Sequence, residues 1–131
     1  MAKLQEQAEE FRYAYGVENT PDNNQMQLDL IAEEFNEFCQ AHAADYWDEP
    51  ESTTGPSLEA EALKELVDLV YVCFQYAENR QWDLYLAYDR VHKSNMSKLG
   101  EDGKPIRRDD GKILKGPNYK PPYLEDLCYL I

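Results

Sequence analysis

Cysteine and long apolar runs are scarce in this 131-residue chain. The three cysteines, Cys39, Cys73 and Cys128, are odd in number and widely spaced and form no CxxC pair, so neither a disulfide framework nor a zinc pattern is present. No apolar run approaches the ~20 residues that a membrane span needs, and the polar N-terminus lacks the pattern of a signal peptide. We therefore expect a reduced, cytoplasmic protein with no membrane partner.

Positive charge is scarce over most of the chain. Residues 1–89 carry 4 Lys and Arg against 20 Asp and Glu, whereas residues 90–120 carry 9 against 4. The net charge of -13 argues against nucleic-acid binding, because a phosphate backbone would be repelled. An acidic body with a basic C-terminal segment instead suits a protein that holds cations in one part and binds phosphates with the other.

Helical periodicity dominates the first hundred residues. The length corresponds to about one domain, and 43% hydrophobic residues are enough for a packed core. Thr20 and Ser57 are expected to cap the second and third helices. The apolar spacing predicts helices over about residues 2–15, 21–46, 57–79 and 82–98. We therefore expect an all-α protein whose four-helix-bundle-like core covers residues 1–99.

Residues 100–131 are expected to form an irregular, basic C-terminal tail of the same domain. Asp102-Gly103 and Asp110-Gly111 are turn signals, and residues 105–115, PIRRDDGKILK, could form a short hairpin. The prolines of the tail exclude a continuous helix, although a last short helix is expected through residues 123–130. The tail is rich enough in lysine to complete a phosphate site begun by the helical core.

The third expected helix carries an acid inside an apolar run. Residues 66–74 read LVDLVYVCF, so we expect this helix to be buried on every side, with Asp68 in the interior or on its rim. Glu65 lies on the same side as Asp68 at ~100° per residue. On the second helix, Glu34 and Glu37 are three residues apart and share one patch. If the two helices pack side by side, two pairs of carboxylates face each other.

The negative charge of such a cluster must be neutralised. A buried unpaired charge costs several kcal/mol, so the acids would be protonated, pair with a base or bind a divalent cation. Lys64 stays open as a local partner, but the bases of residues 1–89 are too few to neutralise the set. Ligands that are all oxygen select a hard ion, which favours Mg²⁺, with Mn²⁺ as a substitute, over zinc.

Two less specific interpretations compete with a metal site. The EExxE stretch alone is also typical of a solvated acidic helix face. The net charge would also suit an acidic, non-enzymatic phage protein that imitates DNA and binds a partner protein. Asp68 in its apolar run fits neither interpretation, because a solvated face or a mimic keeps its charges outside.

The acidic motifs, EExxE at Glu33-Glu34-Glu37 and ExxD at Glu65-Asp68, resemble those of the MazG-like all-α nucleoside triphosphate pyrophosphohydrolases. Relatives in that group include dimeric dUTPases and phosphoribosyl-ATP pyrophosphohydrolases. Residues 20–98 carry the resemblance, and the tail looks like that of bacteriophage members. One departure is Gln27, which stands where many relatives have Arg.

The resemblance implies hydrolysis of a (deoxy)nucleoside triphosphate to its monophosphate and pyrophosphate with Mg²⁺. It places Glu34, Glu37, Glu65 and Asp68 as metal ligands. Either Glu34 or Glu37 could act as the catalytic base that takes the proton of water, and the spacing does not choose between them. By analogy with phage nucleotide-pool enzymes, a purine substrate such as dGTP or GTP is expected, in the host cytoplasm.

The basic segment is expected to bind the substrate, although solvated surface charge is the alternative for the tail lysines. The candidate residues lie on the fourth helix and in the tail and are Lys93, Asn95, Lys98, Lys112, Lys115 and Tyr119. A helix that is apolar on all faces also has more surface to cover than three neighbours manage, so we expect a homodimer or homotetramer. The resemblance implies the same assembly.

Overall fold

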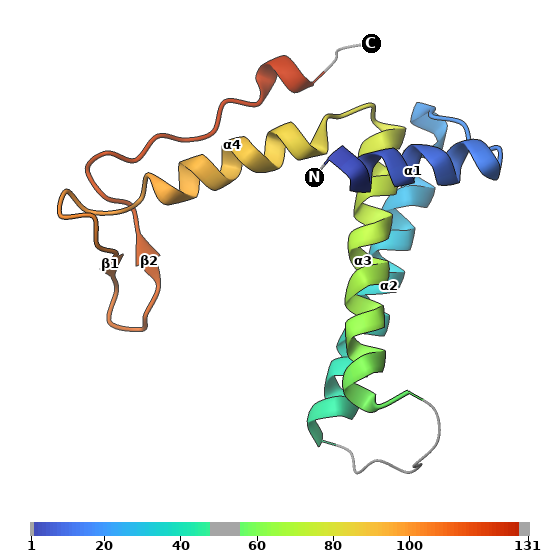
Figure 1. Ribbon diagram of the computed structural model, residues 1–131, viewed down its shortest axis with the longest axis horizontal. Coiled ribbons are helices and arrows are strands. Elements are labelled where there is room, and N and C mark those ends of the chain that lie inside the picture. Colours follow the sequence, from blue (N-terminus) through green and yellow to red (C-terminus); the bar gives the residue numbers. More distant parts are fainter. Residues whose placement is uncertain (1, 48–55, 129–131) are drawn as a thin grey trace. The chain divides into compact units, whose positions relative to one another are not determined.

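The structure, a computed structural model, describes residues 2–47 and 56–128, and it divides after Gln81 into two compact units. The helices are α1 (Ala2–Ala14), α2 (Asn24–Trp47), α3 (Leu58–Asn79) and α4 (Leu84–Met96), with short 3₁₀ turns at Pro21–Asn23 and Glu125–Leu127 (Figure 1). Strands β1 (Ile106–Arg107) and β2 (Ile113–Leu114) are the sheet elements of the described residues. The expected all-α architecture is confirmed, while the single domain over residues 1–131 stays a prediction.

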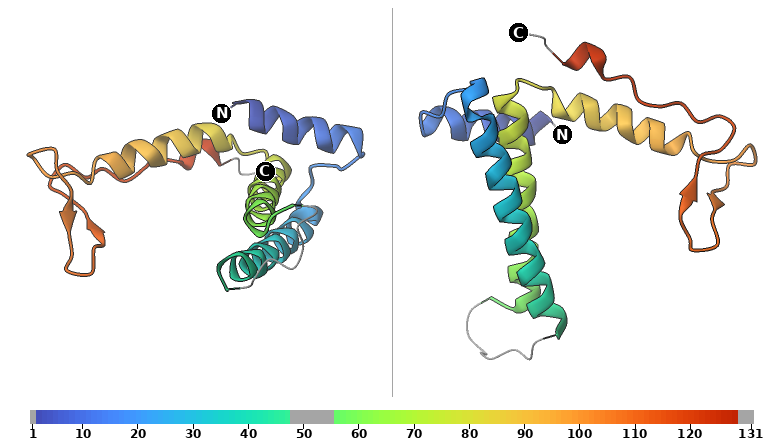
Figure 2. Two further views of the ribbon diagram at one scale, coloured as in Figure 1. Left: turned by 60° about the horizontal axis from the view of Figure 1, so that its bottom comes forward. Right: turned by 180° about the vertical axis from the view of Figure 1, so that it is seen from behind.

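In the first unit, α2 and α3 lie side by side in opposite directions, and α1 crosses the C-terminal part of α3 (Figures 1 and 2). The contact between Asn79 Nδ2 and Asn24 Oδ1, at 2.7 Å, aligns the end of α3 with the start of α2. Counting inward from this pair along both helices brings Glu37 opposite Glu65. The antiparallel register therefore delivers the two acidic motifs to the same level of the seam.

The two expected caps have different outcomes. The Ser57 hydroxyl accepts the Ala60 N–H at 3.1 Å, so this cap is confirmed. The side chain of Thr20 makes no capping hydrogen bond, and that expectation is wrong. Asn79 bonds to the Thr20 backbone instead, accepting its N–H at 3.2 Å and donating to its carbonyl at 2.9 Å. A tertiary contact therefore holds the backbone where the chain enters α2.

The expectation that α3 is buried on every side is wrong within this chain. Leu66, Val67, Val70 and Tyr71 are between 40% and 53% exposed. Burial is concentrated at the C-terminal end of the helix, over residues 75–79. In the first unit, two helices pack on α3, and two neighbours cannot surround a helix. An apolar face is consequently left on the outside of this unit.

The second unit consists of α4, the hairpin and the following segment. Asp83 caps α4 by accepting the Leu86 N–H at 2.9 Å, and the predicted hairpin is present, with Gly111 at φ 90° in its turn. The segment after β2 returns to α4, because the Ser94 hydroxyl donates to the Lys120 carbonyl at 2.7 Å. The last expected helix is reduced to the 3₁₀ turn Glu125–Leu127, and residues 129–131 lie outside the described chain.

Membrane insertion was not expected from the sequence. Among the helices of residues 2–47 and 56–128, none combines the length and the apolar content needed to cross a bilayer.

Candidate metal centre

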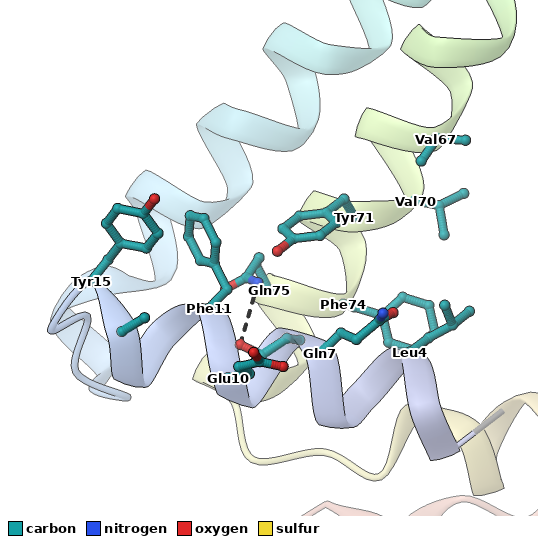
Figure 3. Close-up of a pocket in the computed structure, with 12 residues that line it drawn as sticks. Leu4, Gln7, Glu10, Phe11, Tyr15, Val67, Val70, Tyr71, Phe74 and Gln75 are labelled. Carbon is teal, nitrogen blue, oxygen red and sulfur yellow. Dashed lines mark hydrogen bonds between the residues drawn. The ribbon is translucent and has the colours of Figure 1, made fainter.

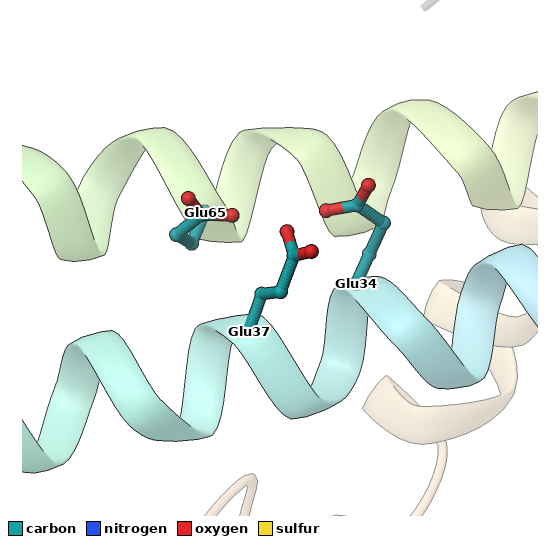
Figure 4. Close-up of side chains that lie close together, drawn as sticks. All are labelled: Glu34, Glu37 and Glu65. Carbon is teal, nitrogen blue, oxygen red and sulfur yellow. The ribbon is translucent and has the colours of Figure 1, made fainter.

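Three carboxylates converge in the seam between α2 and α3. Glu34 and Glu37 extend from α2, one turn apart, and Glu65 approaches from α3 (Figure 4). One oxygen of each side chain lies within 4.8 Å of one oxygen of the other two. These are three of the four residues predicted as metal ligands, and their roles as ligands stay predictions.

Two oxygens of this trio are buried without a hydrogen-bond donor. Glu34 Oε2 and Glu65 Oε2 have no partner among the residues that the structure describes. A buried carboxylate oxygen without a donor is costly, unless a cation or a proton lies against it. Three oxygen donors from carboxylates, with no nitrogen or sulfur among them, match the preference of a hard divalent ion such as Mg²⁺. The residues present therefore fit the expected metal.

Asp68 lies at the edge of this cluster rather than within the trio. Its Oδ2 is 2.7 Å from Lys64 Nζ, and the same ammonium is 3.4 Å from Glu65 Oε1. The Asp68 side chain is 34% exposed and that of Glu65 is 16% exposed, which places Asp68 on the rim. From the sequence, Lys64 remained a possible partner of these acids. In the structure it forms ion pairs with both acids of the ExxD motif.

The cluster shifts the protonation of Glu34. Burial is the main cause that raises the pKa of Glu34 above its ordinary value of 4.5, and the negative charges of Glu37, Asp68 and Glu65 raise it further. The ammonium of Lys64 has a raised pKa for the opposite reason, because it donates to Asp68 and faces two negative charges. Glu34 therefore holds a proton more readily than an ordinary glutamate does.

A pH dependence of stability follows from Glu34 in the metal-free protein. An acid whose pKa is higher in the folded state takes up its proton first in that state, so the folded state gains stability as the pH falls through the raised value towards 4.5. We expect the melting temperature in EDTA to rise as the pH is lowered from neutral towards 4.5. Thermal unfolding in a series of buffers across this range measures the melting temperature.

Glu34→Gln is the matched control for this pH dependence, because it removes the titrating group and should flatten the rise. The acids whose pKa is lowered are Asp89, Asp110 and Asp126, and their contributions to stability are lost only below 3.8, outside the window. A metal-free melting temperature that falls steadily between neutral pH and 4.5 would contradict the prediction.

The six residues predicted to bind substrate all lie in the second unit. Lys93 pairs with Asp89 at 2.8 Å, and Asn95 is exposed on α4. The Lys98 carbonyl accepts the Gly116 N–H at 2.8 Å. This hydrogen bond holds the segment that carries Lys115 and Tyr119 against the end of α4. In that segment, Lys115 Nζ lies 4.8 Å from the centroid of the Tyr119 ring.

The remaining candidate, Lys112, is held by the hairpin turn, where its N–H donates to Asp110 Oδ1 at 3.1 Å. Gly116 has no room for a side chain, since an added Cβ would collide with the Leu99 carbonyl. The structure thus brings Lys98, Lys115 and Tyr119 to one end of the second unit. Their roles towards a substrate stay predictions.

One buried residue was missed by sequence reasoning. Arg12 is only 3% exposed and donates to Asn19 Oδ1 at 2.6 Å and to Asn79 Oδ1 at 2.8 Å. Burial lowers the pKa of Arg12, and the nearby Glu78 opposes that shift. The sequence did hold a sign of this burial: Arg12 follows Ala8 by four residues and so lies on the same, buried side of α1.

A helical pair that gathers EExxE and ExxD carboxylates in one seam, within an all-α chain, defines the class as the MazG-like pyrophosphohydrolases. Comparison with family models gives a match to phosphoribosyl-ATP pyrophosphohydrolase over residues 2–95, and the chain belongs to this family. The matched region contains all four acids and stops short of the tail. No curated protein matches the chain significantly. Membership of a hydrolase family disfavours the non-enzymatic alternative.

Proposed function

We propose that this protein is a Mg²⁺-dependent nucleotide pyrophosphohydrolase. Its substrate would be a (deoxy)nucleoside triphosphate, cleaved between the α- and β-phosphates so that water gives the monophosphate and pyrophosphate. The observation that carries the proposal is the convergence of Glu34, Glu37 and Glu65 within 4.8 Å, with two buried oxygens that lack donors. Mn²⁺ should substitute for Mg²⁺, because both are hard ions that oxygen ligands bind.

The ion would be held by Glu34, Glu37, Glu65 and Asp68. A bound divalent ion supplies screening of the triphosphate oxygens and lowers the pKa of water. The chain's own part is to place the acids on two rigid helices and to accept a proton. Either Glu34 or Glu37 would take the proton of water, and both extend from α2 into the same seam.

The substrate contacts proposed outside the metal centre come from the basic second unit. Phosphoanhydride cleavage depends mainly on charge screening and positioning, and lysine ammonium groups supply both. The residues proposed for this role are Lys93, Asn95, Lys98, Lys112, Lys115 and Tyr119. A purine substrate such as dGTP or GTP is proposed by analogy, in nucleotide-pool control by a phage within the host cytoplasm.

Phosphoribosyl-ATP is the second candidate substrate, since the matched family is described by it. Its hydrolysis breaks the same α–β phosphoanhydride bond, so the metal centre would act on it unchanged. The two candidates differ in the added phosphoribosyl group that the protein must recognise. A direct comparison of both substrates therefore separates them.

We further propose that the protein assembles as a homodimer or homotetramer. The apolar side chains of Val67, Val70 and Tyr71 on α3, together with Leu4 and Phe11 on α1, surround a pocket of about 530 Å³ (Figure 3). Each of these five is at least 37% exposed. An exposed apolar patch of this kind is typical of a protein–protein interface, and self-association would cover the face of α3 that the single chain leaves open.

The experiment that tests the proposed function is a substrate panel. The full chain is incubated with the eight common ribo- and deoxyribonucleoside triphosphates and with phosphoribosyl-ATP, in Mg²⁺, in Mn²⁺ and in EDTA, and products are separated by anion exchange. We expect monophosphate and pyrophosphate in equal amounts, with metal only. Release of orthophosphate with a diphosphate, or equal turnover in EDTA, would contradict the proposal. Light scattering of the active sample gives its mass as a multiple of 15.3 kDa.

A further inference from the structure

Lys64 occupies a distinctive position on the outer side of the candidate metal centre. Its ammonium lies 2.7 Å from Asp68 Oδ2 and 3.4 Å from Glu65 Oε1, so it bridges the two acids of the ExxD motif. The second oxygen of Glu65, Oε2, is the buried one without a donor. The carboxylate of Glu65 is therefore shared, with one oxygen on the lysine and the other available in the seam.

The other bases of the first unit are placed differently. Arg12 is buried and donates to Asn19, Gln75 and Asn79. The Arg80 guanidinium donates to the Tyr76 hydroxyl at 3.0 Å. Within the described part of this unit, Lys64 is the base that forms ion pairs with acids of this set, and its partners are Glu65 and Asp68. It is the cation that the first unit itself supplies to the centre.

The position of Lys64 has two electrostatic consequences. A unit positive charge beside Asp68 and Glu65 opposes the approach of a divalent cation to the same carboxylates. A bound divalent ion would in turn weaken the hold of these acids on the ammonium. The Lys64 side chain is 63% exposed, and its flexible four-carbon stem carries a group with three donors. It is free to turn towards an anion at the rim of the centre.

We propose that Lys64 is a tethered counter-ion: it holds Asp68 and Glu65 in the metal-free protein, and it turns to the substrate's phosphates once a divalent ion binds the acids. This proposal rests on the proposed pyrophosphohydrolase function. Triphosphate brings negative charge to a centre that is itself acidic, so a cation at its rim would offset part of the repulsion between the substrate and the acids. The role is that of a substrate-positioning residue.

The test is the variant Lys64→Met, which keeps the stem and removes the charge. The affinity for Mn²⁺ alone is measured by titration calorimetry, and kcat and KM are measured with the best triphosphate of the panel. We expect Mn²⁺ to bind about tenfold more tightly, because one opposing charge close to a divalent ion is gone. We expect KM to rise about tenfold, with kcat changed much less.

Two further variants serve as controls. Lys64→Arg keeps the positive charge and should leave the Mn²⁺ affinity near that of the unchanged protein while retaining most of the substrate affinity. Lys3→Met removes the same charge from the exposed start of α1 and should change neither quantity. Thermal unfolding in EDTA shows that each variant is folded.

The combination of tighter metal binding and weaker substrate binding is the supporting result. Weaker Mn²⁺ binding in Lys64→Met would overturn the proposal, since Lys64 would then orient the acids. An unchanged KM would overturn it as well, because Lys64 would then be an ordinary surface charge. These results are distinct from failure of the proposed function, in which the unchanged protein would neither bind Mn²⁺ nor release pyrophosphate.

Discussion

Replacing Glu65 with glutamine should lower the turnover rate by a factor on the order of 10³ while the protein stays folded. A metal ion contributes several kcal/mol of transition-state stabilisation, and ~4 kcal/mol corresponds to ~10³ in rate. The neutral amide takes away a negative ligand whose Oε2 is buried without a donor. The assay is pyrophosphate release under saturating Mg²⁺ with the best substrate of the panel.

The same substitution should leave metal-free stability unchanged or raise it. Glu65 adds to the repulsion that raises the pKa of Glu34, so its removal relieves the cluster. Asp68→Asn should also abolish hydrolysis with the fold retained. Loss of activity together with a melting temperature in EDTA that does not fall is the signature of a functional acid, because a merely structural residue would lose both.

Glu61→Gln is the matched control. Glu61 is an exposed acid on α3, one turn before Glu65, and it does not belong to the trio. Its replacement changes the net charge by the same amount but should leave turnover within about twofold, because an exposed charge away from the ion is screened by solvent. Turnover retained in Glu65→Gln, or lost equally in Glu61→Gln, would contradict the assignment.

The second large effect is expected on stability. Arg12→Met should lower the free energy of unfolding by about 3–5 kcal/mol, because several buried acceptors lose their donor at about 1–3 kcal/mol each, which is a large part of the ~5–15 kcal/mol of a typical domain. Without the guanidinium, the side-chain oxygens of Gln75 and Asn79 lose a donor within a buried setting. Urea denaturation followed by circular dichroism measures the change.

Arg12→Met should also impair the metal centre. Asn79 accepts from Arg12 and also holds Thr20 and Asn24 at the start of α2. Arg12→Met should therefore loosen the register between α2 and α3 and weaken Mn²⁺ binding, although no acid is changed. Arg12→Lys keeps the charge but cannot reach the same acceptors with one ammonium, and an intermediate loss is expected. A loss below about 1 kcal/mol in Arg12→Met would show that the network contributes little.

Local patterns predicted most of the helical elements of this protein. Ser57 offers an oxygen that meets the first free N–H groups of α3 whatever the rest of the chain does, so its cap was visible in the sequence. The hairpin around Asp110-Gly111 was visible for the same reason, because Gly111 supplies the positive φ that the turn requires. Thr20 does not cap with its side chain: the Asn23 N–H donates to the Thr20 carbonyl at 3.1 Å, and Asn79, 59 positions away, holds the backbone of Thr20.

The metal centre, too, has one part that local patterns predict and another that they do not. The spacing of Glu34 and Glu37 predicts one patch on α2, and that of Glu65 and Asp68 predicts one patch on α3. No local rule says at which height two helices meet, and here the contacts of Asn79 and Arg12 set it. The exposed apolar face of α3 was also beyond a local rule, since an apolar helix is equally consistent with burial by its own chain or by another.

The sequence by itself determined the helices, the two acidic motifs and the preference for a hard cation, because helix periodicity and ligand chemistry are properties of neighbouring residues. Only the tertiary structure decided which acids converge, which one stays on the rim with Lys64, and which oxygens lack a donor. Those outcomes depend on the register between two helices, and distant side chains fix that register.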